Sequence, residues 1–420
     1  MLNTTRTARR VLAAAAAAAA LAAVPALPAA AAPADSVRDQ QQWVLGMLDV
    51  PSAWLVTQGA GVTVAVIDSG VDPDVSDLAG SVRTGPDYTG LRTSSGNPAW
   101  GEHGTWMASI IAGHGHDFDG DDGITGIAPA ARILSIRVIP DKGDPGYQTY
   151  NAEPEEQIQQ ELAKGILAAV NGGAAVISMS IGYSAPSGAV RAAIQYAYSR
   201  GVVLVASSGN SGDNDTQHAN NGPGMAPVSF PAEYPGVISV GAVDIDRQPA
   251  AFSSGNLSVR VAAPGKGVPA EGRNGLYYTV DGTSPACALV AGVAALIKAR
   301  YPEIPPALVT QALTGTAQQH PAGGYNVLTG FGIVDADAAL ARAGRLMSGK
   351  APGSQVALQS RFGGGAAAVP AAPVSSRSAS GLEAFIALAA GCAAVLTAAG
   401  LRVARTRDRG QRRRERQHAA

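Results

Sequence analysis

Residues 155–210 read EEQIQQELAKGILAAVNGGAAVISMSIGYSAPSGAVRAAIQYAYSRGVVLVASSGN, and this stretch decides the fold. Apolar residues recur at helical spacing in 155–173 and again in 187–201, and both segments end in glycine. Each of them leads directly into a short apolar run, first at 175–182 and then at 202–210. Short apolar strands that alternate with helices predict a parallel sheet covered by helices on both faces.

The same alternation extends to both sides of this stretch. Further apolar runs, typical of strands, lie at 62–70, 132–139, 236–243 and 259–265. The chain has 420 residues, of which 46% are hydrophobic and 15% charged, and it contains 51 glycines. A chain of this length and composition can bury a large core. The sequence therefore predicts an α/β domain, which we place at 61–347.

The N-terminal residues 1–31 have the order of a secretory signal peptide. Arg6, Arg9 and Arg10 precede the apolar run VLAAAAAAAALAAV, and small residues follow up to a cleavage site expected near Ala31. The Arg9-Arg10 pair leaves a twin-arginine export route open. Residues 32–60 are then an N-terminal extension of the domain.

The C-terminal residues predict a membrane anchor. Residues 348–380 are rich in Gly, Ala, Pro and Ser without periodicity, which indicates a flexible linker. A span is predicted at 381–401, where the uncharged residues 384–401 would form a helix of about 27 Å, enough for a bilayer core. Residues 402–420 hold eight arginines and two acids, which indicates a cytoplasmic tail and an extracytoplasmic domain. A buried helix is the alternative that this arginine cluster disfavours.

The balance of charge differs between the parts of the chain. The formal net charge is −1, but the tail carries +6 and the signal peptide +3, which leaves −10 for the exported domain. The arginines are better explained as a topology signal than as a nucleic-acid patch, so no nucleic-acid partner is expected. The two cysteines, Cys287 and Cys392, lie in different segments, so no disulfide framework is predicted.

Four polar residues stand where predicted strands end or helices begin. Asp68 ends an apolar run, Asn210 follows another, His103 opens HGTWMASIIAG, and Ser284 precedes PACALVAGVAALIKAR. In open parallel sheets, functional groups gather at the carboxyl ends of strands. Each residue alone has an ordinary explanation as a turn former, a helix start or an N-cap. Together they form the hydrolytic combination of acid, histidine and serine.

The chemistry of acyl transfer needs these residue types. A serine is a weak nucleophile without a neighbouring base, and histidine takes its proton and later gives it to the leaving amine. A buried aspartate fixes the imidazole tautomer, and a side-chain amide such as that of Asn210 can stabilise the oxyanion. Pro285 has no N–H, which argues against an α/β-hydrolase elbow, where the residue after the serine donates. We expect Pro285 at the first helical position and Ser284 in an extended conformation before it.

These segments resemble the signatures of the subtilisin-like serine proteases, the subtilases. VAVIDSGVD, HGTWMASIIAG, SSGNSG and DGTSPACALVAG follow in that family's order, and the similarity covers residues 40–343. The resemblance implies a subtilisin-like three-layer fold and a serine endopeptidase that works through an acyl-enzyme. No cofactor is expected, and no metal-ligating residues are assigned. The resemblance also implies Asp68, His103 and Ser284 as the catalytic triad and Asn210 as the oxyanion donor.

The sequence departs from the subtilase pattern at three positions. Pro285 and Ala288 stand where the family usually has a bulky apolar residue and a proline, and Trp106 replaces a frequent second histidine. We expect a changed local geometry, with a straight helix at Ala288, and not a loss of activity.

The same resemblance implies a binding site for an extended peptide between two strand edges. The residues expected to bind the substrate are Ser180, Ile181, Gly182, Ser207, Ser208, Gly209 and Ser229. Ser229 is expected at the base of the pocket, which favours a small to medium uncharged residue before the cut. The bond Phe230-Pro231 beside it is a candidate cis peptide.

A narrower resemblance concerns residues 41–72, which are similar to the start of the mycosins, the membrane-anchored subtilases of type VII secretion systems. It implies a type VII secretion complex as a partner. It also implies an extended N-terminal segment that wraps around the domain in place of a folded inhibitory prodomain. Mycosins typically carry disulfides, whereas this domain has a single cysteine, Cys287, which we interpret as a small buried apolar residue.

Residues 114–123, HGHDFDGDDG, are rich in acids. The distal glutamate of an EF-hand is missing, because Ala128 stands there, so a solvated loop is favoured over a calcium site. Two other functions stay open from the sequence: a structural subunit of a secretion complex with an occluded cleft, and an esterase.

Overall fold

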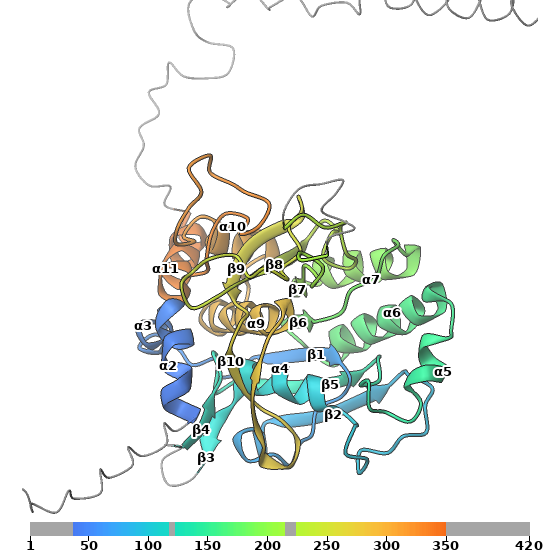
Figure 1. The fold of residues 1–420 in the computed structure, drawn as a ribbon. Helices are drawn as coiled ribbons and strands as arrows, with labels where there is room; N and C mark the ends of the chain where they lie inside the picture. Colours follow the sequence, from blue (N-terminus) through green and yellow to red (C-terminus); the bar gives the residue numbers. More distant parts are fainter. Residues whose placement is uncertain (1–36, 117–121, 215–223, 350–420) are drawn as a thin grey trace, which may run out of the picture. The chain divides into compact units, whose positions relative to one another are not determined.

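The computed structural model describes residues 37–116, 122–214 and 224–349 (Figure 1). The predicted signal peptide, membrane span and basic tail lie outside the described residues, as do nearly all of the predicted linker and the middle of the acidic loop.

A seven-stranded sheet forms the centre of the domain, and all of its neighbouring strands are parallel. The strand order is β2-β5-β1-β6-β7-β8-β9. The strands are β1 (Thr63–Asp68), β2 (Val82–Asp87), β5 (Arg132–Arg137), β6 (Val176–Met179), β7 (Val203–Ser207), β8 (Val237–Val243) and β9 (Val259–Pro264). All six strands expected from the apolar runs are present, and β2 is an additional edge strand that the sequence analysis did not identify.

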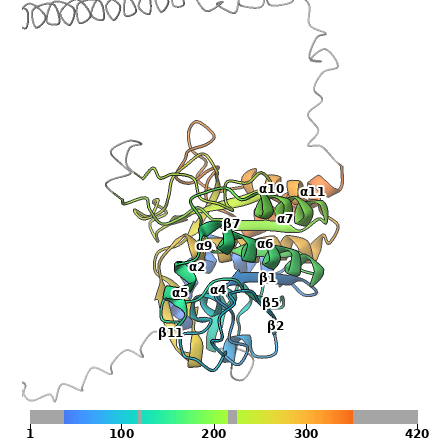
Figure 2. The ribbon, with the colours of Figure 1, turned by 90° about the vertical axis from the view of Figure 1, so that its right-hand side faces the viewer.

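Helices cover both faces of the sheet, which confirms the predicted layers (Figures 1 and 2). The first layer holds α4 (Glu102–Ala112), α9 (Thr283–Arg300), α10 (Pro306–Thr314) and α11 (Ala336–Met347). The opposite layer holds α6 (Glu155–Asn171) and α7 (Gly188–Ser199), which pack against each other. The short helix α5 (Tyr147–Asn151) precedes α6.

The alternation of side chains along β1 shows how the two layers are held. Val64 and Val66 pack with the α4 and α9 layer, whereas Ala65 and Ile67 pack with α6 and α7. All four side chains are almost completely buried. Full burial of a valine or isoleucine contributes about 1.5–3 kcal/mol, so a strand that is apolar on both faces stabilises both layers at once.

The N-terminal extension is helical, and the expectation of an extended segment is wrong for its described part. It forms α2 (Val37–Met47) and α3 (Val50–Trp54). Val44, Leu45 and Leu48 recur at helical spacing and are buried. A helix places these side chains on one face and so buries more apolar surface than an extended segment would. Gln41 fixes α2 to the domain, because its amide donates to the Thr125 carbonyl at 2.7 Å and accepts from the Thr125 N–H at 3.1 Å.

Two small antiparallel hairpins complete the domain, and the sequence analysis predicted neither of them. One pairs β10 (Val268–Glu271) with β11 (Tyr277–Val280), and the other pairs β3 (His114–His116) with β4 (Asp122–Thr125). Single-turn 3-10 helices lie at Ser76–Leu78 and Arg273–Gly275. The second hairpin carries the two ends of the acidic loop. In the part of the chain that the structure covers, no group of three or more His, Cys, Asp or Glu side chains could hold a metal ion.

Helix α9 is the one described helix that is long and apolar enough to cross a membrane. However, 83% of its apolar window is buried inside the domain, so it is the central core helix. The span predicted at 381–401 is a different segment, which lies outside the described residues.

Candidate active site

The Asp68 carboxylate and the His103 imidazole meet at the carboxyl end of the sheet. Asp68 is the last residue of β1 and is fully buried, and His103 is the second residue of α4. His103 Nδ1 lies 2.7 Å from Asp68 Oδ1, and the Ser69 N–H donates to the same oxygen at 2.7 Å. Because a carboxylate only accepts, the imidazole carries a proton on Nδ1, which leaves Nε2 free to act as a base.

The surroundings of His103 favour its charged form. Burial acts to lower the pKa of His103, but the charge of Asp68, the hydrogen bond with it and the charge of Asp141 outweigh burial, and the pKa is raised above its ordinary value. The side chain is still 28% exposed, so a substrate can reach it. An imidazole that is stabilised when protonated suits a base that must hold a proton during acyl transfer.

Ser284 lies at the same edge of the sheet, as the second residue of α9. It is 9% exposed, and its carbonyl accepts a hydrogen bond from the Ser180 hydroxyl at 3.2 Å. Ser284 and His103 line one pocket of about 220 Å³, together with Trp106, Tyr278 and Pro285. Asp68, His103 and Ser284 are far apart in the sequence. The structure brings them together at one edge of the sheet, as the sequence analysis predicted.

The start of α9 differs from the expectation. The helix begins at Thr283, so Pro285 is its third residue and not its first, and Ser284 is helical and not extended. Gly282, with φ 149, makes the turn two residues earlier than predicted, and Asn210 Oδ1 accepts from the Thr283 N–H. Pro285 is nevertheless tolerated, because the first N–H groups of a helix have no intrahelical partner. The helix runs on without interruption past Ala288, as predicted.

Asn210 is oriented by the residue before the serine. Its Oδ1 accepts from the Thr283 N–H at 2.8 Å and from the Thr283 hydroxyl at 2.9 Å. A backbone N–H only donates, so these contacts assign the oxygen and leave Nδ2 on the other side of the amide. That amino group lies next to Gly282, since a Cβ added there would be 3.3 Å from Nδ2. Asn210 therefore presents a donor next to the first turn of α9.

A pocket of about 400 Å³ opens beside Ser284 and Asn210. It is lined by six of the seven residues predicted to bind substrate, namely Ser180, Gly182, Ser207, Ser208, Gly209 and Ser229. The glycines keep it open, because a Cβ at Gly182 would lie 2.5 Å from Ser229 Oγ. Thr283, Ser254 and Tyr183 also line it, and the sequence analysis did not select them.

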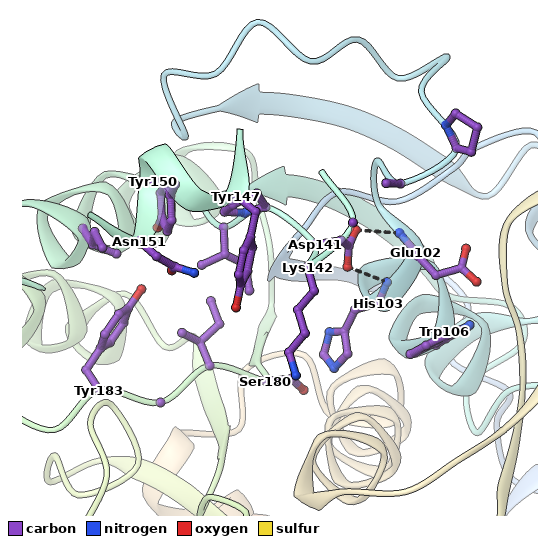
Figure 3. A pocket seen from close by; sticks show the side chains of 18 residues that line it. Glu102, His103, Trp106, Asp141, Lys142, Tyr147, Tyr150, Asn151, Ser180 and Tyr183 are labelled. Carbon is purple, nitrogen blue, oxygen red and sulfur yellow. Dashed lines mark hydrogen bonds between the residues drawn. The ribbon is translucent and has the colours of Figure 1, made fainter. Parts of the chain in front are cut away.

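Ile181, the seventh predicted residue, lines a larger cleft of about 730 Å³ that also borders His103. Its walls carry Tyr147, Tyr150 and Tyr183, and Figure 3 shows Lys142 between Tyr147 and His103. Ser180 and Gly182 line both spaces, whereas Ile181 lines the larger cleft and not the smaller pocket. The sequence analysis missed these tyrosines and Lys142. Lys142, Tyr147 and Tyr150 lie in the connection between β5 and α6, which includes the short helix α5, and Tyr183 follows β6, so no motif marks any of them.

Two smaller expectations near the site are confirmed. The bond Phe230-Pro231 is a cis peptide. Cys287 is a fully buried free thiol in the second turn of α9, and burial raises its pKa to about 11. A thiol held in its neutral form is a poor nucleophile, so Cys287 acts as packing next to the serine.

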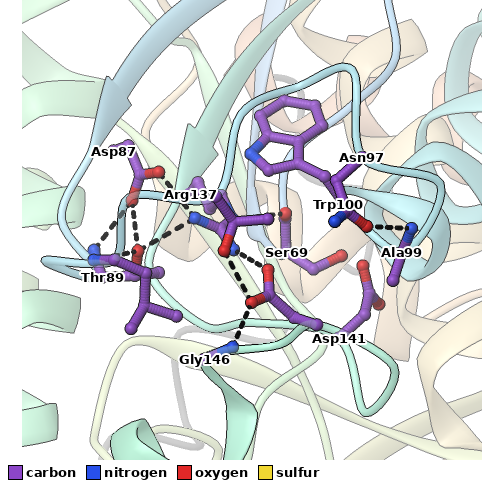
Figure 4. Close-up of polar contacts among 12 residues, drawn as sticks. Ser69, Asp87, Thr89, Asn97, Ala99, Trp100, Arg137, Asp141 and Gly146 are labelled. Atoms are coloured by element: carbon purple, nitrogen blue, oxygen red, sulfur yellow. Dashed lines mark hydrogen bonds and ion pairs between the residues drawn. The ribbon is translucent and has the colours of Figure 1, made fainter.

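A buried cation, Arg137, lies beside Asp68 on the neighbouring strand. Arg137 pairs with Asp68 in the register of β1 and β5 and is 2% exposed. It donates to Asp87 and Asp144, each at 2.7 Å, and to the Ser69 carbonyl at 3.1 Å (Figure 4). Removing one partner of such a pair costs about 3–5 kcal/mol, because the other charge is left buried. The network therefore fixes the strand ends that carry Asp68 and the segment that follows β5.

Comparison with known proteins identifies relatives over most of the chain. The sequence model of the subtilase family matches residues 59–333. Mycosin-1 of Mycobacterium tuberculosis is 35% identical over 332 residues, which cover 71% of this chain and 72% of that protein. Subtilisin DY of Bacillus licheniformis is 33% identical over 282 residues, which cover 67% of this chain and 92% of that protein.

Solved structures agree with these sequence comparisons. MycP1 from the ESX-1 type VII secretion system superimposes with a TM-score of 0.60 at 32% identity, over 71% of this chain and 85% of that one. MycP3 from the ESX-3 system gives a TM-score of 0.58 at 32% identity, over 71% of this chain and 87% of that one. The predicted resemblance to subtilases and to mycosins is therefore confirmed.

Proposed function

This chain belongs to the subtilase family of serine endopeptidases, and from that membership we propose that Asp68, His103 and Ser284 are its catalytic triad. The observation that carries the proposal is the 2.7 Å contact between His103 Nδ1 and Asp68, with Ser284 on a pocket shared with the imidazole. Family membership decides against the esterase alternative.

The proposed mechanism follows from the arrangement. His103 Nε2 takes the proton of Ser284 as the hydroxyl attacks the peptide carbonyl, and Asp68 stabilises the imidazolium that forms. The N–H of Ser284 and the Nδ2 amino group of Asn210 stabilise the oxyanion. Such a side-chain amide donor increases kcat by a factor of about 10²–10³. The imidazolium then protonates the leaving amine, and water repeats the sequence on the acyl-enzyme.

We propose that an extended peptide binds along residues 180–182 on one side and 207–209 on the other, with its main chain paired to the strand edges. The residue before the cut would enter the pocket that ends at Ser229. That pocket has hydroxyl groups and glycines and no charged side chain among its lining residues, which favours a small to medium uncharged residue.

The accessibility of the serine tests this function against a purely structural role. We expect the full chain in membranes to react covalently with a fluorophosphonate probe, and the variant Ser284→Ala to show no labelling. None of the residues of α2 and α3 lines the pockets beside Ser284, so the described part of the extension leaves the site open. A folded wild-type chain that resists the probe would support the structural subunit.

We further propose that the chain is a mycosin-like protease, exported by residues 1–31 and anchored by a span at 381–401 with the tail 402–420 in the cytoplasm. The linker 348–380 would join the domain to this anchor, and the extension 32–60 would stay attached to the domain. The relatives MycP1 and MycP3 come from type VII secretion systems, which supports such a complex as the partner of this chain.

The anchor has its own test. We expect the full chain to stay in the membrane fraction after alkaline carbonate washing, and a chain that stops at residue 380 to be released in soluble form. Protease added to intact cells stripped of their wall should digest the domain but leave residues 402–420 protected. A full chain extracted by carbonate would contradict the anchor without affecting the proposed peptidase.

A further inference from the structure

The N-terminal end of α4 is not capped by its own sequence. A helix leaves its first N–H groups without partners, and a side chain at the N-cap normally satisfies one of them. Here the N-cap is Gly101, which has φ 77 and no side chain to offer. The helix that carries His103 therefore depends on groups from elsewhere in the fold.

Asp141 supplies the missing acceptors. Its Oδ2 accepts from the Glu102 N–H at 2.9 Å and its Oδ1 from the His103 N–H at 3.1 Å (Figure 3). The Ser69 hydroxyl accepts from the next amide, that of Gly104, at 3.1 Å. Both carboxylate oxygens are thus used on the first two amides of α4, and a negative charge lies at the positive end of the helix.

The segment that carries Asp141 is itself held in place. The Asp144 N–H donates to the Asp141 carbonyl at 2.9 Å, and the Asp144 carboxylate pairs with buried Arg137 at 2.7 Å. Asp144 Oδ1 also accepts from the Gly146 N–H at 2.7 Å. These contacts of Asp144 hold the turn at 141–146 in one conformation, so the Asp141 carboxylate is a fixed acceptor.

We propose that Asp141 is a positioning residue for the catalytic histidine, and this rests on the proposed triad. Its carboxylate binds the backbone of His103 while Asp68 binds the imidazole, so the backbone and the side chain of one residue are held by two different acids. A displacement of 1 Å at a reacting group can lower the rate about 10²-fold. Fixing both the backbone and the side chain of His103 prevents such a displacement.

The electrostatic consequence has a definite sign. The charge of Asp141 is one of the contributions that raise the pKa of His103. Burial, followed by the charge of Asp68, raises the pKa of Asp141 itself. The charges of Asp68, His103 and Asp141 therefore influence one another. The charged or titratable side chains that share the pockets of His103 are those of Glu102, Asp141, Lys142, Tyr147, Tyr150, Tyr183, Tyr278 and Asp281, and Asp68 binds the ring.

Hydrolysis requires neutral His103, so the acid limb of kcat/KM follows the pKa of that histidine. Removal of the Asp141 charge takes away a contribution that raises this pKa, and the acid limb is expected to move to lower pH. The fixed backbone is lost as well, so kcat is expected to fall about ten- to a hundredfold with KM nearly unchanged.

The experiment compares Asp141→Asn, Asp141→Ala and Asp141→Glu in the full chain. Asn keeps the size but loses the charge, and Glu keeps the charge and should restore part of the rate. The matched control is Asp335→Asn, because Asp335 caps α11 through the Ala338 N–H at 2.8 Å, away from the site. Asp141→Asn and Asp335→Asn each replace a charged cap acceptor with a neutral amide, but only the Asp141 variants should change kcat and the acid limb.

A merely structural role predicts the opposite pattern. Asp141→Asn would then lower the thermal midpoint as Asp335→Asn does, with the rate per folded molecule and the acid limb unchanged, and the proposal would be overturned. Titration of His103 by nitrogen-15 NMR, assigned with His103→Gln, needs no turnover. A lowered His103 pKa in Asp141→Asn without any hydrolysis in the wild type would show that Asp141 acts on His103 but that the proposed function fails. An unchanged His103 pKa in an active wild type would overturn the Asp141 proposal alone.

Discussion

Replacement of Ser284 by alanine is expected to lower kcat for peptide hydrolysis about 10⁶-fold, the size of effect that loss of a subtilisin nucleophile produces. The physical reason is that the variant has no hydroxyl at this position to form the acyl-enzyme. Cys287, the thiol in the second turn of α9, is fully buried with a pKa raised by burial to about 11 and cannot replace the serine. The measurement is the initial rate on an unstructured protein substrate, with the thermal midpoint of each variant recorded.

The double variant Ser284→Ala with His103→Ala sharpens this test. His103 accelerates the reaction only by activating Ser284, so removal of either residue abolishes the contribution of both. The double variant should therefore be no slower than either single variant. Ser239→Ala is the matched control, because this buried serine has a hydroxyl partner in Ser258 at 3.2 Å and lines none of the pockets at the site. Hydrolysis that persists in clean Ser284→Ala protein would refute the assigned nucleophile.

The change Asp68→Asn is expected to lower kcat about 10⁴-fold while the fold is kept. The new amide would present an N–H or a weaker acceptor to Nδ1 of His103, so the ring would no longer be held in the tautomer that leaves Nε2 free. The Ser69 N–H would also lose a charged acceptor at 2.7 Å. Steady-state kinetics at several pH values measure the effect.

The chain offers a matched control for Asp68→Asn. Asp77 is equally buried and accepts from His116 Nδ1, with 2.7 Å between Nδ1 and Oδ1, in a second Asp–His pair outside the pockets at the site. Asp77→Asn should reduce stability but leave kcat near the wild-type value. Equal losses of rate in the two variants would mean that the effect of Asp68→Asn is a general consequence of disturbing a buried pair.

The sequence by itself determined the alternation of strands and helices and the residues that end the strands. Apolar runs such as 64–67 and 203–206 are buried on both faces, and no surface environment suits them, so their place in a central parallel sheet follows from composition. The same rule predicts that Asp68 and Asn210 meet at one edge. Local rules also give the course of α9, since Ala288 does not interrupt a helix.

The tertiary structure alone decided contacts between segments that are distant in the sequence. That the N-terminal extension is helical depends on the domain surface that buries Val44 and Leu48. The start of α9 shifted because Asn210, 73 positions away, holds the Thr283 N–H. Asp141 had no motif to mark it, and it caps α4 only because the fold brings the turn after β5 to Gly101. Hydrogen-bond acceptors act over about 3 Å of space and are indifferent to sequence distance, so a pattern along the chain cannot reveal them.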